Sequence, residues 1–142
     1  MIMRRCPTID APADFKKSGI IENIDGRGTN LHQFLSDAVY DTIQTCFGGL
    51  LADIPQARDG MTLAEAESEG ISPYMRYYKA EDIINWKEDA SMGGRFSLVV
   101  LRETFDNSDD MFVHKSDVRY RVLTIGEDGY YYISKRRLNK TT

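Results

Sequence analysis

Two glycines on either side of Arg27 form the first pattern in this sequence that could bind a ligand. Gly26-Arg27-Gly28 precedes a predicted helix, and the free backbone N–H groups at a helix N-terminus attract phosphate and other anions. The dinucleotide fingerprint needs a third glycine where this sequence has Leu31, and the sequence contains no Gly-Lys-Ser/Thr of a P-loop. An ordinary turn is therefore the favoured interpretation, and anion binding is the minor alternative.

An acidic run over residues 106–110, with Asp117 further on, superficially resembles a calcium-binding loop. The sixth position of such a loop needs a glycine for its sharp turn, and that position here is Met111. We therefore expect a solvated loop that joins two strands, and no metal site.

The cysteines and histidines are too few and too scattered for a structural zinc site. Cys46 falls in an apolar helical stripe and is expected to be a small buried side chain, and a disulfide with Cys6 is the least favoured alternative. His32 lies at the boundary of the same stripe, and the sequence has no Gly-x-Ser-x-Gly elbow. The sequence thus predicts no catalytic residue, no metal site and no cofactor, and we expect that the protein is not an enzyme.

The composition is that of one ordinary globular domain. The chain has 142 residues and a formal net charge of −4, which argues against a general nucleic-acid coat because that role needs a basic excess. It contains no apolar run of membrane-spanning length, and a signal peptide is not expected at residues 1–14. We expect a flexible N-terminal arm over 1–19, a single α+β domain over 20–135 and a basic tail over 136–142. The basic residues at this end favour a solvated terminus, with contact to nucleic acid or a phosphate-rich partner as the alternative.

One long amphipathic helix is the clearest predicted element. Apolar residues recur at helical spacing from Leu31 to Phe47, and Gly48-Gly49 is expected to end the helix. Short helices follow, one of them begun by Thr62 with Glu65 three residues on, which is a capping-box pattern. We expect the apolar stripe of the long helix to pack on a β-meander.

The second half of the chain reads mainly as β-structure. The aromatic-rich composition of residues 74–79 predicts extended backbone, residues 80–86 favour one or two helical turns, and 95–105 and 118–125 are predicted strands. Glu127-Asp128-Gly129 is a hairpin turn signal, after which the chain pairs back. Since the helices precede an antiparallel meander, the predicted fold class is α+β.

The tyrosines give the main indication of function. Successive residues of a strand face opposite sides of the sheet, so consecutive tyrosines place aromatic rings on both faces. One face can form the core, and the other needs a cover from the chain or from a partner. The candidate interaction surface comprises Tyr77, Tyr78, Tyr130, Tyr131 and Tyr132.

The segment from Glu22 to about Phe105 resembles an uncharacterised family of tailed-phage structural proteins related to portal proteins. Four motifs carry the resemblance: Asp25-Gly26-Arg27-Gly28 before a long helix, Asp53-Ile54-Pro55 at the end of a strand, Ile83-Ile84-Asn85-Trp86 at the end of the next segment, and Leu101-Arg102-Glu103 at the end of a later strand. Their order and approximate spacing agree with the family pattern.

The resemblance implies a non-enzymatic structural module, similar to part of a portal, that acts through protein–protein contacts. Portals are ring-shaped oligomers at the head–tail vertex, and they pass DNA in the full-length family context. The implied partners are this chain itself or other phage structural proteins, in the virion or, for a prophage product, in the bacterial cytoplasm, without a membrane. Because the chain lacks much of a portal's length, we expect monomers or dimers of the isolated chain. The alternative is a small soluble enzyme or ligand-binding domain whose site the sequence does not reveal.

Overall fold

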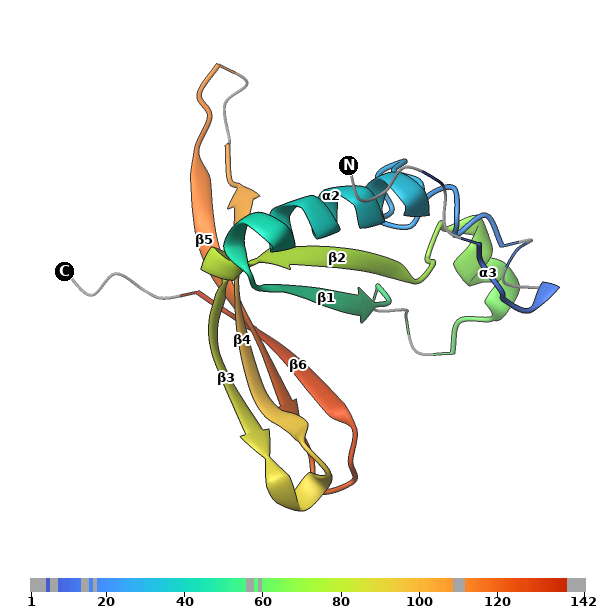
Figure 1. Ribbon diagram of the computed structural model, residues 1–142. Coiled ribbons are helices and arrows are strands. Elements are labelled where there is room, and N and C mark those ends of the chain that lie inside the picture. Colours follow the sequence, from blue (N-terminus) through green and yellow to red (C-terminus); the bar gives the residue numbers. More distant parts are fainter. Residues whose placement is uncertain are drawn as a thin grey trace. The chain divides into compact units, whose positions relative to one another are not determined.

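The computed structural model describes residues 5, 8–13, 16, 18–55, 58, 60–108 and 112–137. Its contacts group the chain into two compact units, Met1–Lys79 and Ala80–Thr142, which are described separately below (Figure 1). The expected division into an arm, one domain and a tail stays a prediction. Within the described ranges, no helix is both long enough and apolar enough to cross a bilayer.

The first unit combines one long helix with a two-stranded sheet (Figure 1). Helix α2 spans Leu31–Thr45, and its first turn is capped by the Asn30 side chain, which accepts a hydrogen bond from the Gln33 N–H at 2.9 Å. Strands β1 (Gly48–Asp53) and β2 (Tyr74–Lys79) pair antiparallel. The predicted long helix and the predicted extended segment over 74–79 are therefore confirmed.

Helix α2 packs on the β1–β2 sheet. Phe34 and Ala38 are its buried residues, and the Tyr77 hydroxyl of β2 donates to Asp41 at 2.8 Å and lies 3.1 Å from the Thr42 hydroxyl. Within this unit the helix therefore packs on the β1–β2 sheet, whose strand pairing the sequence did not predict. The expected partner of the helix was the meander. The reason is proximity along the chain, because β1 begins only three residues after the helix ends.

The end of helix α2 differs from the expectation. Cys46 takes a left-handed conformation with φ 60° and caps the helix, so that its side chain is exposed and not buried in the apolar stripe. Gly48 follows as the first residue of β1, and a Cβ there would clash with the Tyr77 hydroxyl group. Its glycine is therefore needed for the close approach of the Tyr77 ring, and the helix ends before it.

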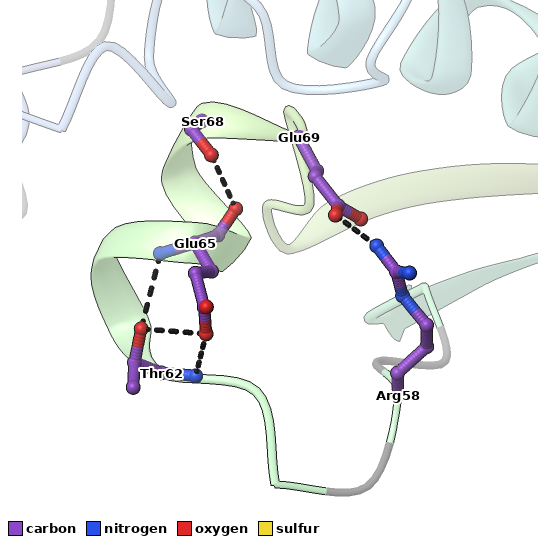
Figure 2. Close-up of polar contacts among 5 residues, drawn as sticks. All are labelled: Arg58, Thr62, Glu65, Ser68 and Glu69. Atoms are coloured by element: carbon purple, nitrogen blue, oxygen red, sulfur yellow. Dashed lines mark hydrogen bonds and ion pairs between the residues drawn. The ribbon is translucent and has the colours of Figure 1, made fainter.

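The short helix α3 (Leu63–Ser68) has the predicted capping box (Figure 2). The Thr62 N–H and hydroxyl both donate to the Glu65 carboxylate at 2.8 Å, and the Thr62 hydroxyl accepts from the Glu65 N–H at 3.3 Å. An ion pair between Arg58 and Glu69 joins the preceding loop to the end of the helix. The bonds between Thr62 and Glu65 satisfy backbone N–H groups that the first turn of a helix otherwise leaves free.

The second unit is an antiparallel meander of four strands in the order β3-β4-β5-β6. Its strands are β3 (Ile83–Asp89), β4 (Arg95–Asp106), β5 (Ser116–Ile125) and β6 (Tyr131–Arg136). An antiparallel meander was predicted, but β3 was not among its predicted strands. The helical turns expected over 80–86 are mostly wrong: a 3-10 turn, η1, covers only Ala80–Asp82, and strand β3 begins at Ile83. A second 3-10 turn, η2 (Ala90–Met92), joins β3 to β4.

The α+β class is confirmed, with α2 as the long helix and antiparallel sheets after it. The predicted series of short helices is shown only in part: among the elements whose full bounds lie within the described ranges, α3 is the one short α-helix, and η1 and η2 are 3-10 turns. The β-rich half satisfies its backbone through sheet pairing, which leaves little chain for helices.

The register of the meander places aligned residues on a common face of the sheet. One face carries Trp86, Val99, Leu123 and Ile133 as one row across the four strands, and Leu101 with Arg121 and Lys135 as the next. The predicted alternation of β5 is thus confirmed, with Arg119, Arg121 and Leu123 on this face. Leu101, Glu103, Arg121 and Leu123 are buried, so this face holds the core of the unit.

Candidate functional site

The candidate site is the exposed aromatic end of the four-stranded sheet, formed by Trp86, Phe96, Tyr130, Tyr131, Tyr132 and Ile133. Strand β3, the start of β4 and the β5–β6 hairpin position these side chains. The exposed fractions of Tyr130, Tyr131 and Tyr132 are 73%, 46% and 56%. The hairpin forms because Gly126 and Gly129 close a short turn, in which the Gly129 N–H donates to the Gly126 carbonyl at 3.0 Å.

Both faces of the sheet contribute to this aromatic end. Tyr131 and Ile133 share the face of Trp86, and Tyr132 lies on the opposite face, in the row of Lys87. A single sheet face can be covered by the chain's own core, but aromatic rings on both faces leave apolar surface in water. The predicted presence of rings on both faces of this strand is therefore confirmed.

Hydrogen bonds hold two of these exposed tyrosines in place. The Tyr131 hydroxyl donates to the Phe96 carbonyl at 2.8 Å, and the Tyr132 hydroxyl donates to the Asp128 carboxylate at 2.6 Å. The bond from Tyr132 lowers the pKa of Asp128, with a further contribution from the Tyr130 N–H, and the same bond raises the pKa of Tyr132. Anchored rings lose little conformational freedom when a partner covers them, which favours binding.

The other two tyrosines of the predicted surface lie in the first unit. Tyr78 is buried, and Tyr77 is half-buried with its hydroxyl bound to Asp41. Burial, together with the Asp41 carboxylate, raises the pKa of Tyr77 even though the bond to Thr42 opposes the change. The assignment of all five tyrosines to one interaction surface stays a prediction, and the exposed ones are those of the β5–β6 hairpin.

A buried ionic cluster on the core face was missed by the sequence reasoning. The Glu103 carboxylate accepts a hydrogen bond from Arg119 Nε at 2.7 Å and forms an ion pair with Arg121 Nε at 3.0 Å. The side chains of Glu103 and Arg121 are only 4% and 2% exposed. The charged residues in the two predicted strands were the one sequence signal for this cluster. That signal was not sufficient, because the cluster depends on the register, which sets Arg119 opposite Glu103.

Phe105 extends this cluster along β4. The Arg119 and Arg137 guanidinium groups lie 5.3 Å and 4.7 Å from the centre of its ring, within the range of cation–π attraction. Arg137 comes directly after β6, so this contact fixes the end of that strand. The cluster stabilises the sheet and does not act as an acid or base, because two arginines already neutralise the Glu103 carboxylate.

The glycine turn before helix α2 is occupied by the chain's own carboxylate. Asp25 accepts hydrogen bonds from the Arg27 N–H at 2.8 Å and from the Thr29 N–H and hydroxyl at 3.1 Å and 2.7 Å. Burial opposes ionisation of Asp25, but these bonds prevail and lower its pKa. The Asn23 side-chain oxygen accepts a hydrogen bond from the Gly28 N–H at 2.6 Å. Three backbone N–H groups of this turn are therefore bonded to the chain's own side chains.

The acidic loop lies partly outside the described residues. Asp106 accepts hydrogen bonds from the N–H and hydroxyl of Ser108, and Asn107 donates to Asp117 at 3.0 Å. Asp109, Asp110 and Met111 of the predicted loop are outside the described ranges, as are Cys6 and Lys140. Among the described residues, no three His, Cys, Asp or Glu side chains form a group that could hold a metal ion.

The aromatic end of the sheet is thus suited to contact with another macromolecule. No family model matches the sequence, and no curated protein is significantly similar to it. The resemblance to tailed-phage structural proteins stays a prediction from the motifs.

Proposed function

We propose that this protein is a non-enzymatic structural module of a phage or prophage, similar to part of a portal protein, which works through protein–protein contacts. The observation that supports the proposal is the set of exposed aromatic side chains at one end of the four-stranded sheet. Aromatic residues are enriched at the centres of protein interfaces, where their large surface is removed from water. The resemblance supplies the phage context.

The charge of the chain favours a protein partner over DNA. The formal net charge is −4, and three of the basic residues of the meander, Arg119, Arg121 and Arg102, are paired with carboxylates of the same unit. A protein that binds the phosphate backbone of DNA needs unpaired cationic side chains to neutralise the phosphates. Passage of DNA therefore belongs to the full-length family context and not to this surface.

Sedimentation velocity over a range of concentrations tests the interaction role. Tyr131→Ser and Tyr132→Ser are expected to weaken any association at least several-fold, because each removes an exposed ring from the aromatic end. Tyr40→Ser is the matched control, since Tyr40 is also exposed but lies on helix α2 in the other unit. Equal association of all three variants and the unchanged protein would refute the proposed role of the aromatic end.

Two further observations separate this proposal from the alternative of a small enzyme or ligand-binding domain. Neighbouring genes for a terminase and a capsid protein would support the phage assignment, and a metabolic operon would contradict it. Thermal shift with calcium, zinc, ATP and NAD is expected to show no stabilisation. A ligand at 100 times its dissociation constant adds about 2.7 kcal/mol, so a real site would be visible.

A further inference from the structure

Among the described strands, β6 forms a regular edge of the meander that pairs on one side only. In the strand order of the sheet, β5 is its neighbour on one side, and all six of its residues, Tyr131–Arg136, are exposed. The opposite edge, β3, has two register irregularities, one between Ile83 and Asn85 and one between Lys87 and Glu88. Such bulges are a common way of protecting an edge from pairing, so β6 is the edge better suited to receive another strand.

The hairpin geometry shows which backbone groups of β6 point away from β5. The Gly126 N–H donates to the Tyr130 carbonyl at 2.9 Å, so residues 126 and 130 form a hydrogen-bonded pair. Hydrogen-bonded pairs alternate along an antiparallel ladder, and the register continues from there as Ile125 with Tyr131. The groups of residues 132, 134 and 136 therefore face β5, whereas those of Tyr131, Ile133 and Lys135 face outward.

We propose that β6 pairs antiparallel with β6 of a second copy of this chain, about a two-fold axis at Ile133. This inference rests on the proposed function and names its partner and its mode of contact. In this register the outward backbone N–H and C=O groups of Ile133 pair with those of Ile133 in the other copy. The outward backbone groups of Tyr131 pair with those of Lys135. The two meanders join into one continuous eight-stranded sheet, a form of β-strand addition.

The side chains of β6 are complementary to themselves in this register. Tyr131 and Lys135 share one face of the sheet, so the cation of each copy lies beside the aromatic ring of the other. Tyr130 and Arg136 meet in the same way at the ends of the pairing, and Ile133 forms an apolar centre. A register centred on Lys135 would instead place two cations directly opposite each other, which is unfavourable.

The size of the contact predicts weak association. Six residues on each side bury less surface than the roughly 1,600 Å² of a standard interface. A two-fold contact also closes at two copies and does not extend into a ring. The expected species are therefore a monomer and a dimer in concentration-dependent exchange.

A proline at the centre of β6 is the sharpest test. Ile133→Pro removes an N–H that points outward, so it leaves the ladder with β5 complete and is expected to raise the dissociation constant of the dimer at least tenfold. Ile133→Val is the matched control, because it keeps the N–H and nearly the same side chain. Circular dichroism and thermal melting establish that both variants fold. Equal dimerisation of two folded variants would overturn the proposal.

Disulfide trapping gives a second measurement that does not depend on the proline. In a Cys6→Ser, Cys46→Ser background, Ile133→Cys is expected to form a covalent dimer at least tenfold faster than Asn85→Cys, which is exposed on the β3 edge of the same sheet. Directly opposite residues of a hydrogen-bonded pair lie about 5.5 Å apart at Cα, which suits a disulfide. Equal rates of the two variants would contradict pairing through β6.

These results are distinguishable from failure of the proposed function. If the tyrosine variants weaken association but Ile133→Pro does not, the aromatic end binds through its faces, and only the edge pairing is wrong. If neither the tyrosine variants nor the proline changes the sedimentation of the protein, both proposals are refuted for self-association.

Discussion

Removing the Glu103 carboxylate from the meander should be among the most damaging single changes to the second unit. Glu103→Leu leaves the Arg121 guanidinium, whose side chain is 2% exposed, buried without its carboxylate. Loss of one partner of a buried ion pair costs about 3–5 kcal/mol. Arg119 is 30% exposed and can turn towards water, so its share of the loss is at most about 1 kcal/mol.

A urea titration followed by circular dichroism measures this effect. With a slope of about 2 kcal/mol per molar urea, Glu103→Leu is expected to lower the unfolding midpoint by about 1.5–2.5 M. Asp82→Asn is the matched control, because Asp82 and Arg102 form an ion pair at 3.1 Å that is partly exposed and not buried. Its cost should stay below about 1 kcal/mol.

The double variant Glu103→Leu, Arg121→Leu tests the cause of the loss. Replacing both members of a buried pair by apolar residues is often neutral, so the double variant should recover most of the stability that the single variant loses. The reasoning is refuted if Glu103→Leu costs less than about 1 kcal/mol. It is equally refuted if the double variant is no more stable than the single one.

Three other predictions concern the helices and the hairpin. Phe34→Ala should cost about 3–5 kcal/mol in a urea titration because the ring is buried against the β1–β2 sheet, and a loss below about 1 kcal/mol would contradict that packing. Thr62→Ala removes the reciprocal bonds with Glu65 and should weaken the first turn of α3 by about 1 kcal/mol, seen as faster amide exchange at Glu65; unchanged exchange would count against the capping box. The pKa of Asp128 is lowered from its ordinary 3.8, so its contribution to the hairpin is present above that value and is lost as the pH falls through the lowered one. The Tyr132 ring signals in NMR spectra should shift with that loss, and constant signals down to about pH 2 would refute the bond.

Local patterns in the sequence predicted most elements of the fold. The helical spacing of apolar residues located α2, the capping box located α3, and the alternation in β5 assigned its residues to the correct faces. These features depend on neighbours within a few positions, so a single sequence contains the information. Trp86 shows where this reasoning failed, because a short apolar run reads equally well as a helical turn or as a strand.

The candidate site was predicted only in part because exposure depends on distant parts of the chain. Tyr77 and Tyr131 look alike in the sequence, yet the first is bound to Asp41 of helix α2 and the second is exposed on the hairpin. Arg121 looks like a surface residue, but the register brings it beside Glu103 in the core. Cys46 was misplaced because a left-handed helix cap at a non-glycine residue has little local signal.

Strand β4 changes its structural role along its length. From Leu98 to Leu101 it has β3 on one side and β5 on the other, whereas beyond Arg102 its continuing partner is β5, up to the pair of Asp106 with Ser116. A two-stranded ribbon is only marginally stable without further contacts. The outer part of β4 should therefore open and close many times for each global unfolding event, with amide exchange rates that rise steadily from Leu101 towards Asp106. One part of this continuous strand thus exchanges only by global unfolding and the other by local opening. The Glu103 cluster lies at the boundary between the two parts.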